Sequence, residues 1–342
     1  MDKVKKILIN IAGTLAFPVI VFVVFFAVTH LANTPSVFSF NLIPNVVQNI
    51  GVGILIALGM SVNMATFRID LSAGAVTTLT AIVVGSIAVD HGWPGWLFMI
   101  VCMVSGVICS TFNGAVYAFL RLPSMIVSLG VTMVLESITV LYRGGKGVTI
   151  LTGPIREFGG APTIFIILIL AMIVFHVVME YTGFGFDQKA FAGNKRIAVD
   201  NGKKERKNVI ISYAFSGIFF GLAALPYINY FGTVDAASNM SSASVMFDAM
   251  LPVLIGSFIA RFSNQVIAIV VAVFSMKMMS YGLICCGFNN TMQNVVSGVM
   301  IICLVFSSAP NSTDLSSAAQ DPPQTKLFPY LPLANGPISE FL

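Results

Sequence analysis

The side chains that could do chemistry in this 342-residue chain are few and widely spaced. Its three histidines, His30, His91 and His176, have no cysteine, histidine or carboxylate at the spacing of zinc ligands. Neither a P-loop nor a glycine-rich dinucleotide fingerprint occurs, so we expect no nucleotide hydrolysis by the chain itself. The sequence therefore predicts a protein that is not an enzyme and holds no metal or cofactor.

Ionisable residues inside apolar segments are functional candidates, because a charge within a membrane is costly. Asp70 either shapes a re-entrant turn and caps the next helix together with Ser72, or forms an ordinary interfacial ion pair. Glu136 either belongs to a proton or solute pathway or bonds a neighbouring helix. His176 and Glu180 lie four residues apart on one predicted helix face, which favours helix pairing over a proton relay.

Buried amides form the second group of candidates, because an amide in lipid needs a partner or a wet cavity. Asn49, Asn63 and Asn113 all fall within apolar segments, and Ser61 lies close to Asn63. We expect these four residues to line a polar route, alongside structural packing by the small residues around them.

Residues 183–208 form a charged island that holds 10 of the chain's 32 charged residues. Phe184, Phe186 and Phe191 are interspersed with these charges, and an ordinary solvated loop would not explain such aromatic anchors. The pattern predicts a short mixed-charge helix over 195–207, lying along the membrane face and filling a groove on a soluble partner.

Apolar segments must carry these residues, since the chain is 57% hydrophobic and 9% charged. A membrane span needs about 20 apolar residues, and each helix must satisfy its own backbone. The sequence predicts an all-α polytopic membrane protein with about ten transmembrane helices. They are placed near 7–30, 46–66, 71–89, 95–119, 125–142, 163–182, 209–231, 249–260, 266–284 and 292–308.

Lysine and arginine set the orientation, because cytoplasmic loops carry an excess of both. With ten spans and a cytoplasmic N-terminus, fourteen of these residues fall inside, three outside and Lys277 within a span. The 183–208 island is then cytoplasmic. The formal charge of +4 fits anchoring to the anionic lipid bilayer, and no nucleic acid is expected as a partner.

The chain divides by composition into a transmembrane domain, 1–308, and a tail, 309–342. The tail is rich in serine, proline and alanine and has no helical period. Such a segment cannot bury enough apolar surface to fold, so we expect a disordered cytoplasmic tail.

Two stretches resemble permease subunits of ribose- and xylose-type sugar ABC importers, a family that also contains branched-chain amino acid permeases. MSVNMATFRIDLSAGAVTTLTA is similar to the segment around that family's Asp-Leu-Ser signature. GVICSTFNGAVYAFLRLPSMIVSLGVTMVLESITVLYRGGKGV matches its Asn-Gly and Arg-Leu-Pro patterns. The resemblance covers about 45–305, and the Arg121–Gly130 run is its most specific part.

The resemblance implies a ten-span permease of the cobalamin-importer (type II) kind in a bacterial inner membrane. Two such subunits, identical or not, would form the pathway. A cytoplasmic ABC ATPase would use the ATP, and a periplasmic or lipid-anchored solute-binding protein would deliver a monosaccharide. By resemblance, the ATPase-coupling segment comprises Gly193, Asn194, Lys195, Arg196, Ile197, Ala198 and Val199.

The chain departs from the family pattern at several positions. Ala192 stands where the family usually has a glycine before its Gly-Asn turn, and 261–265 replaces a Gly-Gly-x-Gly run. Nucleosides, a furanosyl signalling molecule and branched-chain amino acids stay open as cargo. The alternative from another class is a proton-coupled secondary transporter that uses Glu136, His176 or Glu180.

Overall fold

A computed structural model gives the fold of the chain. It describes residues 43–120, 122–160, 162–260 and 262–285, with scattered residues in 11–23 and 295–299. The chain separates into two compact units, Phe38–Val253 and a second unit made of Met1–Val37 with Leu254–Leu342. The predicted first and last spans and the predicted tail lie largely or wholly outside the described residues.

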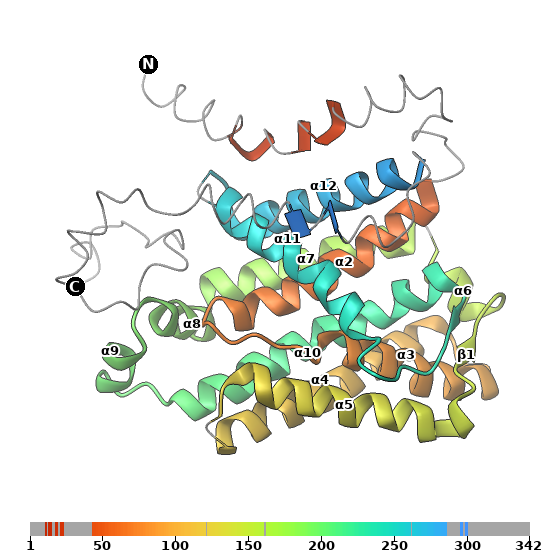
Figure 1. Ribbon diagram of the computed structural model, residues 1–342, viewed down its shortest axis with the longest axis horizontal. Coiled ribbons are helices and arrows are strands. Elements are labelled where there is room, and N and C mark those ends of the chain that lie inside the picture. The colour runs from red at the N-terminus through yellow and green to blue at the C-terminus, as the bar shows by residue number, and fades with distance from the viewer. Residues whose placement is uncertain are drawn as a thin grey trace. The chain divides into compact units, whose positions relative to one another are not determined.

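The described residues are mostly helical, and Figure 1 labels the elements. In chain order they are α2 (Ile43–Met64), α3 (Ala73–Asp90), α4 (Gly95–Leu120), α5 (Ser124–Leu141), η2 (Tyr142–Gly145), β1 (Val148–Thr149), α6 (Pro154–Phe158), α7 (Thr163–Tyr181), α8 (Gly183–Gly193), α9 (Lys195–Asp200), α10 (Glu205–Phe231), β2 (Thr233–Val234), α11 (Ala243–Ile259) and α12 (Gln265–Cys285).

Six described helices are long and apolar enough to cross a membrane: α3, α4, α5 with η2, α7, α10 and α12. Two shorter apolar helices, Gln48–Met64 of α2 and α11, accompany them. The chain is therefore a multi-pass membrane protein. The apolar runs in the sequence located these helices closely, because a membrane span forms one uninterrupted apolar run.

Helix α10 forms the centre of the first unit and packs on α4, α2 and α3. Glycines make its contact with α4 close, as a Cβ on Gly217 or Gly221 would overlap the backbone of Gly106 or Cys102. On the α2 side, Ser216 Oγ donates to the carbonyl of Gly59 at 2.8 Å. Small residues let these helix backbones approach, as is typical of membrane helix pairs.

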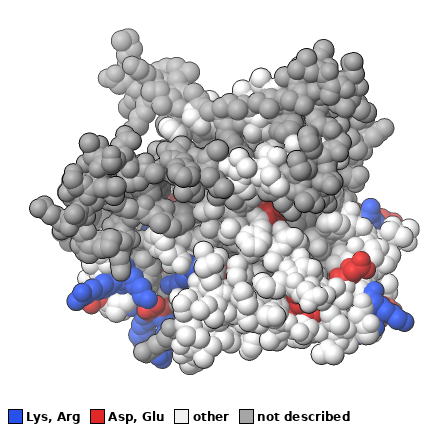
Figure 2. Space-filling view, in the orientation of Figure 1, with Lys and Arg blue, Asp and Glu red and all other residues white. Residues whose placement is uncertain are grey.

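The two ends of the first unit carry most of its charge. At one end, β1 pairs antiparallel with β2, and Arg143 forms an ion pair with Asp90. At the other end lie α8, α9 and the start of α10. Figure 2 shows basic side chains at two opposite edges, with a largely uncharged surface between them. This is the charge distribution of a protein whose middle faces lipid.

Two predictions about elements were wrong. The predicted helix over 195–207 breaks after Asp200, because Gly202 takes a left-handed φ of 81° and α10 already begins at Glu205. The eighth span, predicted at 249–260, begins six residues earlier at Ala243. The polar run before Phe247 hid this start from a search for apolar residues.

We expect Gly221→Leu to lower the free energy of unfolding by about 1–3 kcal/mol, because the new side chain would overpack the contact with α4. Gly130→Leu is the matched control, since a Cβ there meets open space on α5. Thermal denaturation of the purified chain in detergent measures both. Equal midpoints for the two variants would contradict the packing described here.

Candidate functional site

The segment between α2 and α3 is irregular yet buried. Phe67 turns the chain with a left-handed φ of 59°, and Arg68 and Asp70 are 5% and 1% exposed. Ser124 Oγ accepts from the N–H of Ile69 at 3.1 Å, which ties the segment to the start of α5. Residues 65–72 therefore re-enter the apolar body before α3 begins (Figure 1).

Asp70 organises the end of this segment. Its Oδ1 accepts from Ser72 N at 2.9 Å, Ser72 Oγ at 2.7 Å and Asn113 Nδ2 at 3.0 Å. The Ser72 carbonyl accepts the first hydrogen bond of α3, from Val76 N at 2.8 Å. The carboxylate thus lies at the N-terminal end of α3, where the helix dipole stabilises a negative charge. Asn113 joins α4 to the same cluster.

Arg68 connects this segment to α10. Both of its terminal nitrogens donate to Asn208 Oδ1, at 3.3 and 3.4 Å. Burial lowers the pKa of Arg68 from its ordinary value, yet a guanidinium stays charged in proteins. Because Asn208 lies in the first turn of α10, the α2–α3 segment and the start of α10 are held together.

Glu136 performs a similar task for the segment before α11. It is 3% exposed, and its carboxylate accepts from Met240 N at 2.7 Å, Ser242 N at 2.9 Å and Ser242 Oγ at 2.5 Å. Thr139, one turn along α5, exchanges two hydrogen bonds with the backbone of Ala237. Of the two sequence alternatives for Glu136, the geometry matches a bond to a neighbouring element.

The two irregular segments meet each other. A Cβ on Gly74, in the first turn of α3, would overlap the carbonyl of Ser242. Both Ser72 and Ser242 directly precede the first residue of a helix, and each gives its N–H and hydroxyl to a buried carboxylate. We call this meeting of the starts of α3 and α11 the crossing point.

Sequence reasoning selected Asp70, Asn113 and Glu136 but missed Ser242, the partner of Glu136, and Gly74, which meets Ser242. A usable signal was the repeated Ser-Ala pair at 72–73 and 242–243, each after a polar run that follows an apolar span. Nothing in the sequence showed that the two runs meet.

The other predicted polar residues lie apart from the crossing point. Ser61 Oγ donates to the carbonyl of Leu58 within α2, and Asn49 is half-buried. Asn63 is fully buried, and its side-chain amide has no hydrogen-bond partner among the described residues. Asn49 precedes Asn63 by about 21 Å of helix. A polar route through these residues stays a prediction.

The predicted coupling segment forms a preformed elbow of two helices, α8 and α9. Asn194 Oδ1 caps α9 by accepting from Arg196 N at 3.0 Å and Ile197 N at 3.1 Å. Ala198 is buried and anchors α9, whereas Ile197 and Val199 are 57% and 43% exposed. Apolar side chains exposed beside basic ones are typical of a protein-binding surface.

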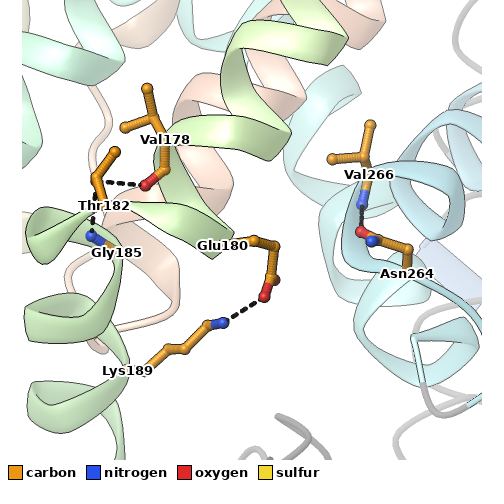
Figure 3. Close-up of polar contacts among 7 residues, drawn as sticks. All are labelled: Val178, Glu180, Thr182, Gly185, Lys189, Asn264 and Val266. Atoms are coloured by element: carbon orange, nitrogen blue, oxygen red, sulfur yellow. Dashed lines mark hydrogen bonds and ion pairs between the residues drawn. The ribbon is translucent and has the colours of Figure 1, made fainter.

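Ion pairs hold the elbow in place. Lys189 pairs with Glu180 of α7 at 2.6 Å, and Thr182 Oγ1 accepts from Gly185 N to begin α8 (Figure 3). Lys195 Nζ lies 2.6 Å from Glu205 of α10, and Lys203 lies 2.5 Å from Asp187. Figure 3 also shows Asn264, at the start of α12 in the second unit, accepting from Val266 N.

The aromatic residues of the island do not all face outward. Phe191 is buried, and Phe184 packs edge-on against Phe215 of α10 with ring centroids 5.5 Å apart. Phe186 is 58% exposed. Two of the three predicted aromatic anchors therefore pack against the elbow's own protein. No described group of three or more His, Cys, Asp or Glu residues could hold a metal ion.

Residues 42–305 match the family described as the branched-chain amino acid transport system/permease component. The chain belongs to this family. The match spans α2 to α12, so it includes both the crossing point and the elbow. No solved structure matches the chain.

Curated relatives of the permease are similar over most of their length. The galactofuranose transporter permease protein YtfT of Escherichia coli (strain K12) is 27% identical, covering 73% of this chain and 74% of its own. The galactose/methyl galactoside import permease protein MglC of the same strain is 26% identical, covering 78% and 86%. An autoinducer 2 import permease, LsrD of E. coli (strain SMS-3-5 / SECEC), is 24% identical, covering 73% and 78%.

We expect Glu136→Gln to lower the free energy of unfolding by about 1–3 kcal/mol, because the amide nitrogen would face backbone donors without an acceptor. Ser242→Ala removes a single hydroxyl bond to the same carboxylate and should cost about 1 kcal/mol. Chemical denaturation in detergent compares the two. A Glu136→Gln variant as stable as the parent would contradict the capping role.

Proposed function

We propose that this permease is the membrane subunit of an ATP-driven ABC importer for a monosaccharide or a related small polar solute. The observation that carries the proposal is the elbow, a capped and anchored helix that presents basic and apolar side chains at one end of a permease. The chain would form the translocation pathway, and a separate cytoplasmic ATPase would hydrolyse the ATP.

Sugar cargo is favoured over the amino acids in the family's description. The relatives reported above carry galactofuranose, galactose or autoinducer 2 in their names. A neutral sugar needs hydroxyl and amide partners more than fixed charges along its route. The buried carboxylates of Asp70 and Glu136 are already engaged with serine and backbone donors, which fits a pathway without a fixed charge for an amino-acid zwitterion.

The assembly we propose has a ten-span permease of the type II kind, paired with a second permease in a bacterial inner membrane. A periplasmic or lipid-anchored solute-binding protein would deliver the sugar to the β1–β2 end. The N-terminus and the elbow would be cytoplasmic. Fourteen lysine and arginine residues fall inside under this arrangement and three outside, which supports the orientation.

A proton-coupled secondary transporter fits the geometry less well. Glu136 accepts three hydrogen bonds from the segment before α11, and Glu180 is paired with Lys189 at the opposite end of the unit. A relay would need these groups to lie within hydrogen-bond reach of each other.

We expect Arg196→Glu and Ile197→Asp each to reduce stimulation of the partner ATPase at least tenfold while the chain still enters the membrane. Both side chains are exposed on α9, and Arg196 is a cleaner choice than Lys195, whose amine already pairs with Glu205. Lys146→Glu, exposed at the other end, is the control. Stimulated ATPase activity of the purified complex is the measurement. Full stimulation of both α9 variants would contradict docking at the elbow.

Orientation has its own test. A cysteine at Lys203 should react with a membrane-impermeant thiol reagent in inside-out vesicles, and a cysteine at Lys146 in intact spheroplasts. The parent chain, with its own five cysteines, gives the background. Reversed labelling of the two positions would place the elbow on the outer side of the membrane, where a cytoplasmic ATPase could not bind it.

A further inference from the structure

An exposed polar strip borders the crossing point. Ser238, Asn239, Ser241 and Ser244 are exposed, while Ala237 before them and Ser242 among them are buried. The segment thus turns one edge toward Glu136 and the opposite edge outward. We call the four exposed residues the serine strip.

The strip lies deep within the span of the protein. Ser242 meets Gly74, which precedes Asp90 at the far end of α3 by about 24 Å of helix. Glu136, which holds the strip, precedes the end of α5 by about 7 Å. Both helices end at the Asp90–Arg143 pair, so the strip lies between about 7 and 24 Å from that end, within a hydrocarbon core of about 30 Å.

Irregular backbone at this depth does not face lipid. Lipid cannot satisfy free N–H and C=O groups, so such backbone occurs where protein buries it or where it lines a water-filled cavity. Left-handed φ angles of 53° at Asn239 and 60° at Met240 make the strip irregular. The lipid-type surface looks different, since most exposed positions at a similar level of α5 are apolar, as at Met133, Val134 and Ile138.

The side chains of the strip suit hydroxyl groups. Ser244 Oγ donates to the carbonyl of Ser241 at 2.8 Å, which leaves its oxygen free to accept. Ser241 Oγ accepts from Ser238 N at 3.1 Å and keeps its proton to donate. Asn239 adds an exposed amide.

We propose that the serine strip is the solute-contacting surface of the translocation pathway and that it takes neutral, polyhydroxylated solutes. The proposal rests on the importer function above and assigns a surface to it. Glu136 is a positioning residue in this scheme, because it holds the backbone that presents the strip and itself faces inward. The elbow supplies the coupling, and the strip supplies the contact with cargo.

Water accessibility tests the strip without knowledge of the cargo. Ser241→Cys and Asn239→Cys, in the full importer under ATP turnover, should react with a charged methanethiosulfonate at least tenfold faster than Met133→Cys. Met133 is the matched control, because it is exposed on α5 one turn from Glu136. The rate of the parent chain, which has its own cysteines, is subtracted from the rate of each variant. Reaction at the rate of Met133→Cys would overturn the proposal.

Uptake tests the ligand class, with radiolabelled D-galactose as the probe. Ser244→Ala should reduce ATP-driven uptake about fivefold with ATPase activity unchanged, because it removes one hydroxyl contact. Ser137→Ala is the control, since Ser137 Oγ likewise bonds a backbone carbonyl, at Met133, but lies on the exposed face of α5. Equal uptake by the two variants would overturn the assignment of Ser244.

The two tests separate this proposal from the function on which it rests. A parent importer that takes up no galactose with ATP present would count against the proposed cargo, and the labelling rates would still decide whether the strip faces water. Fast labelling together with normal uptake by Ser244→Ala would show that the strip faces water and that Ser244 does not contact the cargo.

Discussion

Unsatisfied backbone inside an apolar body is the constraint on which this structure depends. Two segments, 65–72 and 235–242, leave helical geometry within the apolar body, where lipid cannot satisfy their backbone groups. A buried carboxylate accepts hydrogen bonds from each segment. Asp70 accepts from Ser72, and Glu136 accepts from Met240 and Ser242. Each negative charge also lies at the start of a helix, where the backbone dipole favours it.

Helix α10 connects the irregular α2–α3 segment to the elbow, where we propose that the ATPase docks. Its first turns contact the elbow through the Lys195–Glu205 pair and the α2–α3 segment through the Asn208–Arg68 bonds. Further along, Thr77 of α3 donates to the carbonyl of Phe220 on α10. Helix α10 therefore connects α9 to α3, one of the two helices that form the crossing point, and the glycine contacts with α4 support α10.

The two proposed contact surfaces differ in the chemistry that their partners require. The elbow carries the cations and exposed aliphatic side chains that a large soluble protein can pair and bury. The serine strip carries hydroxyls and an amide, which can exchange hydrogen bonds with a small neutral solute and release it again. Strong fixed charge on the strip would hold cargo too tightly for passage.

The sequence by itself determined most of the span positions among the described residues, the charged island and the identity of Asp70, Glu136 and Asn194 as residues worth attention. Each of these rests on a local signal: an apolar run, a charge density or a polar residue in apolar surroundings. Tertiary structure alone decided that Ser242 meets Gly74, that Lys195 is engaged by Glu205, and that two of the island's phenylalanines point inward. Those contacts join residues far apart in the chain, or choose between two faces of one short helix, and local pattern carries no information on either.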